Sequence, residues 1–230
     1  MRFAVIAAGA GNRLTEEGMS VPKPLVTVCG EPMIGRLLRI MRNCGAEGIS
    51  VIVNPANIRT IEYLESVRDI YNLNLVIKAT ESSMHSLYEL SPWLSGGKSC
   101  VTTVDTVFKE DEFRDYVDYF GCNEADGVMG VTDFVDDEKP LYVGVDECGM
   151  INGFYDGKSC CNYVSGGIYG LTEKSFDTLG RCVAAGQSRM RAFQRQMVAD
   201  GLRLEAYRFG KIIDVDHISD IAKAEEMIKK

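Results

Sequence analysis

Short apolar runs alternate with segments of helical pattern through the first half of the chain. The predicted strands are residues 3–7, 49–53, 73–78 and 100–104, and the predicted helices are residues 34–42, 58–67, 84–94 and 112–120. Continuous apolar residues, as in Val51-Ile52-Val53, indicate strands that are buried on both faces. Strands of this kind, separated by helices, are typical of a parallel sheet that helices cover on both sides.

The second half of the chain has shorter strand-like runs with turn residues between them. Strands are predicted at 128–131, 141–145, 150–154, 167–171, 204–207 and 212–215, and helices at 191–199 and 220–228. The runs between residues 128 and 171 indicate an antiparallel or mixed extension of the same sheet. We therefore expect one α/β domain over residues 1–230, built as a three-layer α/β/α sandwich around a mostly parallel mixed sheet.

The size and composition allow a large buried core. The chain has 230 residues, of which 46% are hydrophobic and 25% are charged. No window approaches the roughly 18 apolar residues of a membrane span. The net charge of −8 argues against broad nucleic-acid binding, which depends on cations that neutralise phosphates. An acidic protein can still bind a triphosphate, because a few local cations and Mg²⁺ dominate such a site.

The cysteines form no recognisable metal-binding pattern. There are eight of them, none in a Cys-x-x-Cys pair, and only two histidines, so a zinc site is not expected. We expect reduced, mostly buried thiols in a cytoplasmic protein. The first apolar run is short, and Arg13 follows where a cleavage region would lie, so a signal peptide is not expected.

A glycine loop follows the first predicted strand. Gly9 and Gly11 lie at its carboxyl end, where α/β folds place ligands, and glycines let backbone N–H groups approach a phosphate closely. A dinucleotide fold would require a third glycine, but Leu14 stands near that position, and a Walker pattern is absent as well. The loop alone is also consistent with an ordinary glycine turn.

Two cations change this interpretation. Arg13 follows the glycine loop and can reach a phosphate that the loop holds, while Lys23 lies between Pro22 and Pro24, which fix the local backbone. A preorganised cation suits an anion whose charge is redistributed in a transition state. Taken alone, Lys23 would also fit a solvated surface lysine in a proline-rich turn.

Three segments carry a resemblance to a known family. They are Ala7-Ala8-Gly9-Ala10-Gly11-Asn12-Arg13-Leu14, Pro22-Lys23-Pro24-Leu25-Val26 and Gly30-Glu31-Pro32-Met33-Ile34. In order and spacing they resemble the signature of the nucleotidyltransferases that make activated sugars and alcohols. That family includes sugar-1-phosphate nucleotidyltransferases, phosphocholine cytidylyltransferase and molybdopterin guanylyltransferase. The resemblance implies a Rossmann-like fold of the nucleotide-diphospho-sugar transferase type.

The same segments imply which residues bind the nucleotide. The implied set is Ala8, Gly9, Ala10, Gly11, Asn12, Arg13 and Lys23, with Arg13 and Lys23 as the catalytic residues. The loop and the arginine would hold the β- and γ-phosphates, and the lysine would stabilise charge around the α-phosphate. Asn12 replaces the serine or threonine that is common in the family, which is a mild departure.

The resemblance also implies a metal-binding aspartate after a central strand and a second carboxylate near the C-terminus. Asp105 fits the first, although Val104 stands where many family members have glycine. Asp216 is the better candidate for the second and Asp214 the alternative; two residues apart in a strand, both would point to one face. Mg²⁺ is the expected cofactor, since it usually takes one or two protein carboxylates beside phosphates and waters.

Recognition of the base and of the acceptor is less clear. The resemblance implies Glu81, Ser82 and Ser83 for the base, and Lys158, Gly166 and Gly167 for the acceptor. The base segment lies between a predicted strand and a predicted helix, where hydroxyl residues also serve as helix caps. The lysine is placed only by a loose register, so a surface lysine fits as well.

The resemblance implies an enzyme of the nucleotidyltransferase class. It would transfer NMP from a nucleoside triphosphate to a sugar 1-phosphate or a small phospho-alcohol and release pyrophosphate. One alternative is a GT-A-type glycosyltransferase, although its Asp-x-Asp motif usually follows a central strand and here lies near the C-terminus. Another is an inactive nucleotide-binding regulatory subunit, although such relatives commonly lose the arginine, the lysine or the metal aspartates.

Several properties stay open at this stage. The sequence does not disclose the base, the acceptor or the oligomeric state, a homo-oligomer included. We expect no nucleic-acid or membrane partner. Because the chain stops soon after the catalytic core, we expect no appended acyltransferase-like repeat domain.

Overall fold

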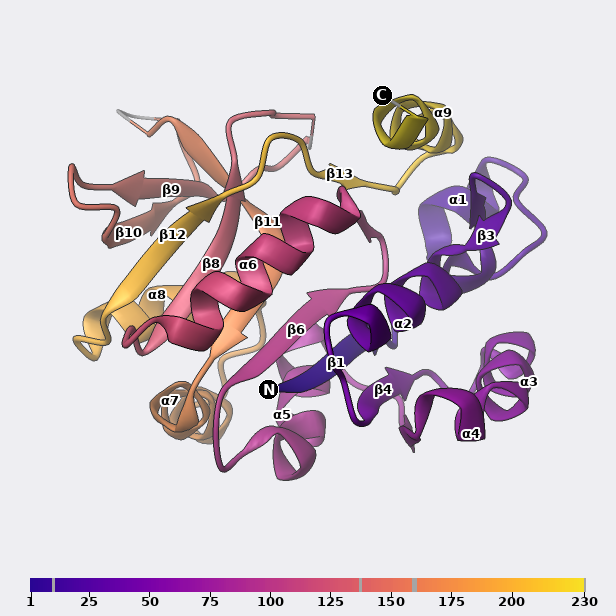
Figure 1. Cartoon of the computed structure of the whole chain (residues 1–230), viewed down its shortest axis with the longest axis horizontal. Coiled ribbons are helices and arrows are strands. Elements are labelled where there is room, and N and C mark those ends of the chain that lie inside the picture. Colours follow the sequence, from indigo (N-terminus) through magenta and orange to yellow (C-terminus); the bar gives the residue numbers. More distant parts are fainter. Residues whose placement is uncertain (10, 137, 159–160, 230) are drawn as a thin grey trace.

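Strands and helices alternate along the chain (Figure 1). The computed structural model describes residues 1–9, 11–136, 138–158 and 161–229. The strands are β1 (Arg2–Ala7), β2 (Thr27–Val28), β3 (Glu31–Pro32), β4 (Ile49–Val53), β5 (Leu73–Ile77), β6 (Ser99–Thr103), β7 (Thr106–Val107), β8 (Gly127–Thr132), β9 (Tyr142–Val145), β10 (Ile151–Tyr155), β11 (Tyr163–Leu171), β12 (Leu204–Arg208) and β13 (Ile213–Asp214). The helices are α1 (Asn12–Glu16), the 3-10 helix η1 (Lys23–Leu25), α2 (Met33–Asn43), α3 (Ile58–Ser66), α4 (Arg68–Tyr71), α5 (Ser83–Leu94), α6 (Glu110–Cys122), α7 (Glu173–Ala184), α8 (Met190–Ala199) and α9 (Ile218–Lys229).

The central sheet is parallel on one side and mixed on the other. Its strands follow the order β10-β9-β11-β6-β1-β4-β5, and β8 pairs with both β11 and β12. Neighbours among β6, β1, β4 and β5 are parallel. β11 runs antiparallel to β6 and β8, and β12 is parallel to β8. The predicted mostly parallel sheet with a mixed extension is confirmed.

Helices cover both faces of the sheet because side chains of successive strand residues point to opposite faces. From β1, Phe3 and Val5 belong to a buried cluster with residues of α2 and α6, which lie in front of the sheet in Figure 1. Ala4 and Ile6 belong to a second cluster with residues of α5, α7 and α8. The three-layer α/β/α arrangement that the apolar pattern predicts is therefore confirmed.

A third apolar cluster joins the two ends of the chain. It includes Leu14 of α1, Val28 of β2, Ile213 of β13 and Met227 of α9. Figure 1 shows α9 beside α1 and β3. This packing fixes the C-terminal segment against the loop that follows β1, and so decides which late residues reach the carboxyl end of the central strands.

Helix α7 was not predicted. It begins after a capping box formed by Thr172 and Ser175, and its buried residues Phe176, Leu179 and Cys182 recur every three positions. This spacing of apolar residues is a helical signal in the sequence, but Gly180 and the polar residues between these positions weaken it. The elements α1, η1, α4, β2, β3 and β7 were also missed, because periodicity is not detectable over two to five residues.

Two strand predictions had the wrong extent. β11 begins at Tyr163, before the predicted start at residue 167. The strand predicted for 212–215 is only β13, which pairs with β7 in a separate two-stranded sheet. Within the described ranges, none of the helices has the length and apolar character that crossing a bilayer requires.

Candidate active site

The glycine loop leads from β1 into α1 and lies against Lys23. Gly11 has a left-handed backbone with φ of 64°, a conformation that glycine adopts readily and other residues rarely. A Cβ on Gly11 would lie 2.8 Å from the Lys23 Cβ, whereas a Cβ on Gly9 would have nothing within 4 Å. Gly11 is therefore a point of close packing and Gly9 is open. Ala10, which the sequence predicts to bind nucleotide, lies outside the described residues.

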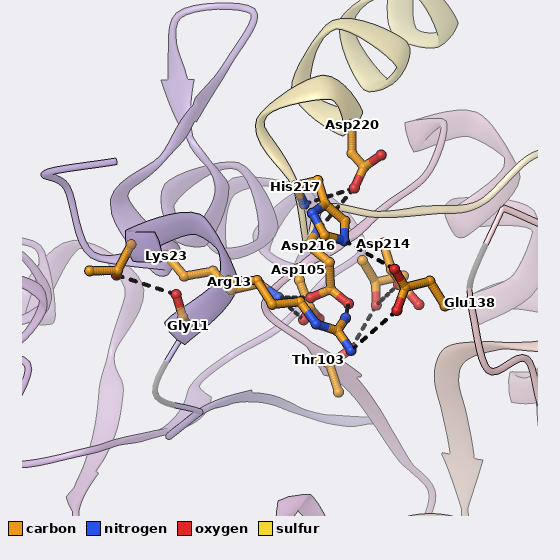
Figure 2. Close-up of polar contacts among 12 residues, drawn as sticks. Gly11, Arg13, Lys23, Thr103, Asp105, Glu138, Asp214, Asp216, His217 and Asp220 are labelled. Atoms are coloured by element: carbon orange, nitrogen blue, oxygen red, sulfur yellow. Dashed lines mark hydrogen bonds and ion pairs between the residues drawn. The ribbon is translucent and has the colours of Figure 1, made fainter. Parts of the chain in front are cut away.

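Lys23 is the centre of a charged cluster (Figure 2). It begins η1 and is flanked by Pro22 and Pro24. Its side chain is only 11% exposed, and its Nζ donates to Asp105 Oδ2 at 2.5 Å and to Asp216 Oδ1 at 2.6 Å. Burial disfavours the charged ammonium, but the two carboxylates outweigh burial and raise the pKa of Lys23. This excludes a freely solvated surface lysine.

Asp105 lies just beyond β6, at the carboxyl end of the parallel strands. The chain still follows β1 there, since the Val104 N–H donates to the Ile6 carbonyl at 3.0 Å. Burial disfavours the carboxylate, but the charge and hydrogen bond of Lys23 outweigh burial and lower the pKa of Asp105 below its usual value. Asp105 is therefore an anion that faces the loop after β1.

Asp216 contacts both cations of the cluster. Its Oδ1 accepts from Lys23, and its Oδ2 accepts from Arg13 Nη1 at 2.5 Å. The backbone of this segment is fixed by Asp220, whose Oδ2 accepts from the N–H groups of Asp216 at 3.2 Å and of His217 at 2.8 Å. Residues that lie 193 positions apart, Lys23 and Asp216, thus share one hydrogen bond.

The start of α9 is tied to the end of α1. Glu17 Oε2 accepts from the Ile218 N–H at 2.7 Å, and Glu17 Oε1 lies 2.5 Å from His217 Nδ1. The hydrogen bond and charge of Glu17 raise the pKa of His217. These contacts hold the segment with Asp216 next to the helix that carries Arg13.

Asp214 has a different environment from its two neighbours. Its Oδ1 accepts from Thr106 Oγ1 at 3.2 Å. Enclosure by the walls of the cleft, together with the charges of Asp105 and Asp216, raises the pKa of Asp214 above its usual value, although the residue remains accessible from the cleft. The cluster therefore crowds three carboxyl groups around two cations.

The prediction that Asp214 and Asp216 point to one face of a strand is wrong, because the two residues do not lie in one strand. β13 ends at Asp214, and the Asp216 N–H donates back to the Asp214 carbonyl at 3.1 Å, so the chain turns between them. The two carboxylates meet in the same cleft because of this turn and the packing of α9. Alternation along a strand does not produce their arrangement.

The carboxylates fit Mg²⁺ only if a ligand completes the site. Asp105 and Asp216 present oxygens to the same ammonium group and so lie on one side of the cleft. In the part of the chain that the structure describes, no group of three or more His, Cys, Asp or Glu is arranged to hold a metal ion. Such a pair suits Mg²⁺, which usually takes its remaining ligands from phosphates and waters.

A cavity of about 580 Å³ lies beside this cluster. Among the residues that the sequence singles out, it is lined by Ala8, Gly9, Gly11, Lys23, Glu81, Ser82, Ser83, Asp105, Gly167 and Asp214. A small adjoining cavity of about 50 Å³ is lined by Arg13, Gly166, Asp214 and Asp216. Asn12 and Arg13 line a third, of about 280 Å³, with Lys23. Most of the predicted residues are therefore brought together.

One end of the large cavity is formed by the start of α5. Ser82 caps this helix, since its Oγ accepts from the His85 N–H at 3.4 Å. The Glu81 side chain is 80% exposed. Ser82 therefore caps the helix, as predicted for a hydroxyl residue in this segment, and it also lines the cavity.

The other end carries residues that the sequence did not single out. Lys139, Arg191 and Gln194 line the cavity there. Arg191 Nη1 donates to Asp156 Oδ1 at 2.7 Å. Lys158 is exposed and does not line the large cavity. A helix pattern at 191–199 was visible in the sequence, but nothing in it showed which face of α8 meets the cavity.

The two glycines of β11 lie in a bulge. The register between β11 and β8 shifts between Ser165 and Tyr169. A Cβ on Gly166 would lie 2.2 Å from Ile212 Cδ1, and a Cβ on Gly167, which has φ of 71°, would lie 2.6 Å from Thr106 Oγ1. Gly167 therefore requires glycine, because of its backbone and the space of its Cβ, whereas a Cβ on Gly166 would displace the terminal methyl of Ile212.

Comparison with known proteins gives a family match over most of the chain. The family model described as a MobA-like NTP transferase domain matches residues 3–197. The 2-aminoethylphosphonate cytidylyltransferase of Lancefieldella rimae is 29% identical over 111 residues, which are 46% of this chain and 44% of that protein. The match therefore spans less than half the length of this curated relative.

Two solved structures share the fold over almost the whole chain. The inositol-1-phosphate CTP transferase from T. maritima has a TM-score of 0.80 and 21% identity, covering 100% of this chain and 97% of that one. The CTP:phosphocholine cytidylyltransferase from Streptococcus pneumoniae has a TM-score of 0.77 and 19% identity, covering 98% of both chains. At these identities, the likeness concerns the fold alone.

Proposed function

The chain belongs to the family of MobA-like NTP transferase domains, and on this premise we propose that it catalyses nucleotidyl transfer. The reaction joins an NMP group from a nucleoside triphosphate to a phosphate- or phosphonate-bearing acceptor and releases pyrophosphate. The observation that carries the proposal is the position of Lys23. Its ammonium lies between Asp105 and Asp216 at the wall of a cavity large enough for a nucleotide, and its Cβ lies against Gly11 of the loop.

The chemical step needs positioning more than proton transfer. An oxygen of the acceptor attacks the α-phosphorus, and the bond from that phosphorus to the oxygen bridging to the β-phosphorus breaks. The acceptor oxygen is already ionised, so no general base is required. Lys23, whose raised pKa keeps it charged, exchanges a carboxylate partner for an oxygen of the α-phosphate. Arg13 and the backbone of the glycine loop hold the phosphates that leave.

Charge balance supports a divalent cation in this reaction. Three carboxyl groups, those of Asp105, Asp214 and Asp216, surround Lys23 and Arg13, so this cluster has no excess of positive charge with which to attract a triphosphate. Asp105 and Asp216 would hold Mg²⁺, with Asp214 beside them. Bound there with the phosphates, Mg²⁺ would neutralise part of their charge and help to align the reactants.

We assign the two ends of the cavity to the two substrates. The end with Glu81, Ser82 and Ser83 is adjacent to the glycine loop and suits the nucleoside. The opposite end carries Lys139 and Arg191, and two cations suit the anionic group of the acceptor. This replaces Lys158, which lies outside the large cavity, as the proposed acceptor contact.

Cytidine is the first nucleoside to test. The curated relative is named a 2-aminoethylphosphonate cytidylyltransferase, and the two structures described above are named for CTP, whereas other structures of the same fold are named for sugar phosphates. We therefore propose CTP as donor and a small phospho- or phosphono-alcohol or amine as acceptor, ahead of sugar 1-phosphates.

A pyrophosphate-release screen tests the function. The protein is incubated with Mg²⁺, each of ATP, CTP, GTP and UTP, and separate pools of alcohol phosphates, aminoalkyl phosphonates and sugar phosphates. We expect release with CTP and one pool, and a product that contains both CMP and the acceptor. Transfer of sugar from an NDP-sugar would instead support the glycosyltransferase alternative. Nucleotide binding without turnover in any pool would support a regulatory subunit.

A further inference from the structure

The hydroxyl of Thr106 holds one of the three carboxyl groups of the site, that of Asp214, by a hydrogen bond. Thr106 is 1% exposed. Its Oγ1 lies 2.7 Å from Thr103 Oγ1 and donates to Asp214 Oδ1 at 3.2 Å. Because the Thr106 proton goes to Asp214, the Thr103 hydroxyl donates its own proton to Thr106 Oγ1. A hydrogen-bonded pair of hydroxyls therefore holds the Asp214 carboxyl group.

The bulge in β11 makes room for these hydroxyls. A Cβ on Gly167 would lie 2.6 Å from Thr106 Oγ1 and 3.0 Å from Thr103 Oγ1. Gly167 lies in the cavity wall, so the absence of a side chain lets the hydroxyl pair lie directly behind that wall. A buried hydroxyl pair without room to move has one arrangement, which suits it to fix a neighbour's position.

The backbone already joins the two acidic segments without these side chains. Asp214 pairs with Thr106 in the β7–β13 ladder, and the Val215 N–H donates to the Asp105 carbonyl at 3.0 Å. The ladder sets where the Asp214 backbone lies, but a carboxylate on it can still rotate. The hydrogen bond from the Thr106 hydroxyl favours one rotamer of Asp214 over the others.

Three carboxylates compete for Lys23, and only two of them hydrogen-bond it in the described structure. Asp105 and Asp216 contact its Nζ at 2.5 and 2.6 Å, while Asp214 is held by Thr106. The charge of the Lys23 ammonium already acts on Asp214, so without that hydroxyl the ammonium becomes a competing donor for the Asp214 carboxylate. A shift of Asp214 onto Lys23 would occupy the cation that the proposed reaction requires.

We propose that Thr106 is a positioning residue: its hydroxyl, braced by Thr103, holds Asp214 away from Lys23, so that Lys23 is shared by Asp105 and Asp216 alone. The proposal rests on the proposed function for its kinetic consequence, but its structural consequence does not depend on catalysis. Thr106 itself contacts neither the phosphates nor the acceptor in this scheme.

The test compares Thr106→Val, which removes the hydroxyl at nearly constant shape, with Thr106→Ser, which keeps it. Thr102→Val is the matched control, since Thr102 is a fully buried threonine of the neighbouring strand β6 whose hydroxyl donates to the Thr103 carbonyl at 3.2 Å. We expect Thr106→Val to lower kcat about tenfold or more, the usual effect of losing a hydrogen bond to a charged group. The KM for the triphosphate should change less than kcat, because the residue binds no substrate.

Thr106→Ser should restore most of the lost kcat, and Thr102→Val should resemble the unmodified protein. A crystal structure of Thr106→Val without nucleotide should show the Asp214 carboxylate in contact with Lys23 Nζ. Equal kcat in Thr106→Val and the unmodified protein would overturn the proposal, as would an equal loss in Thr102→Val or an unmoved Asp214. If Thr106→Val does not fold, the same structural and kinetic comparison is made with Thr103→Val, which removes the brace. If the unmodified protein shows no turnover, the proposed function fails, and the position of Asp214 still decides this proposal.

Discussion

Gly11 and Lys23 are in direct contact, although the helix α1 and a turn separate them in the sequence. A Cβ on Gly11 would lie 2.8 Å from the Lys23 Cβ, closer than two carbon atoms normally approach. The glycine loop and the lysine are therefore one packed unit. Any displacement of the loop moves the ammonium group relative to Asp105 and Asp216.

Replacing Gly11 tests this contact. Gly11→Ala combines a left-handed backbone, which costs roughly 1–2 kcal/mol for other residues, with a clash against Lys23. For a chain of this size we expect the melting temperature to fall by roughly 2–8 °C, and kcat to fall as Lys23 is displaced. Differential scanning fluorimetry and pyrophosphate release measure the two effects.

Gly9→Ala is the control for that experiment, because a Cβ on Gly9 would have nothing within 4 Å. Its melting temperature should stay within about 1 °C of the unmodified protein. If Gly9→Ala were destabilised as much as Gly11→Ala, the contact between Gly11 and Lys23 would not be the cause.

Lys23 should be indispensable for turnover. Lys23→Ala removes the charge that the proposal places at the α-phosphate, and the loss of one such group lowers kcat roughly 10²–10³-fold. Steady-state pyrophosphate release with saturating triphosphate measures it. Near-normal turnover in Lys23→Ala would remove Lys23 from the mechanism.

Arg191 should matter for the acceptor and not for the triphosphate. Arg191 and Arg195 both pair with Asp156, at 2.7 and 2.9 Å, but only Arg191 lines the large cavity. We expect Arg191→Ala to raise the KM for the acceptor roughly 10- to 100-fold, as loss of a charged hydrogen bond would. Arg195→Ala should leave that KM nearly unchanged.

Lys158→Ala separates the structural proposal from the sequence-based one. Its KM for the acceptor should equal that of the unmodified protein, because Lys158 is exposed and outside the large cavity. A rise comparable to that of Arg191→Ala would instead return the acceptor contact to Lys158.

Removal of divalent metal should abolish turnover. With EDTA in excess we expect no pyrophosphate release, and full recovery when Mg²⁺ is restored above the chelator. Asp105→Asn should require a higher Mg²⁺ concentration for half-maximal rate, since one charged ligand is lost. Turnover that persists after thorough chelation would contradict the assigned role of Asp105.

Asp200 provides a pH-dependent contribution to stability far from the cleft. It accepts hydrogen bonds from Thr178 and Gln196, each at 2.7 Å, and from Arg181. These bonds lower the pKa of Asp200 from 3.8 to about 2. Because the pKa is lower in the folded protein, the stabilisation is complete above about pH 4 and is lost as the pH falls toward 2.

Asp200→Asn should therefore lower the free energy of unfolding at pH 7 by about 1 kcal/mol, the net value of a typical hydrogen bond. The difference between the two proteins should shrink from pH 4 to pH 3. Urea unfolding at pH 7, 4 and 3 measures it, with Asp177→Asn on the exposed side of α7 as control. A difference that stayed constant with pH would show that the charge of Asp200 is not the cause.

Much of the site follows from local sequence, and the rest from packing. The glycine loop, the flanking prolines of Lys23 and the position of Asp105 after a buried strand are short-range features, so they were predicted and lie at one cleft. Lys139 and Arg191 were not predicted, because a cavity-lining role depends on how the loop before β9 and the helix α8 pack against the sheet. Lys158 was placed from register alone, and the structure shows it exposed.

The sequence by itself determined the alternation of the longer strands and helices in the first half of the chain, the buried parallel strands and the loop that carries Gly11, because periodicity and backbone restriction act over a few residues. Only the tertiary structure decided how the acidic residues share the cations. Asp216 reaches Lys23 across 193 positions because α9 packs on α1 and β2 and the chain turns after β13. Such a contact depends on strand order and on the burial of apolar faces, which no local pattern contains.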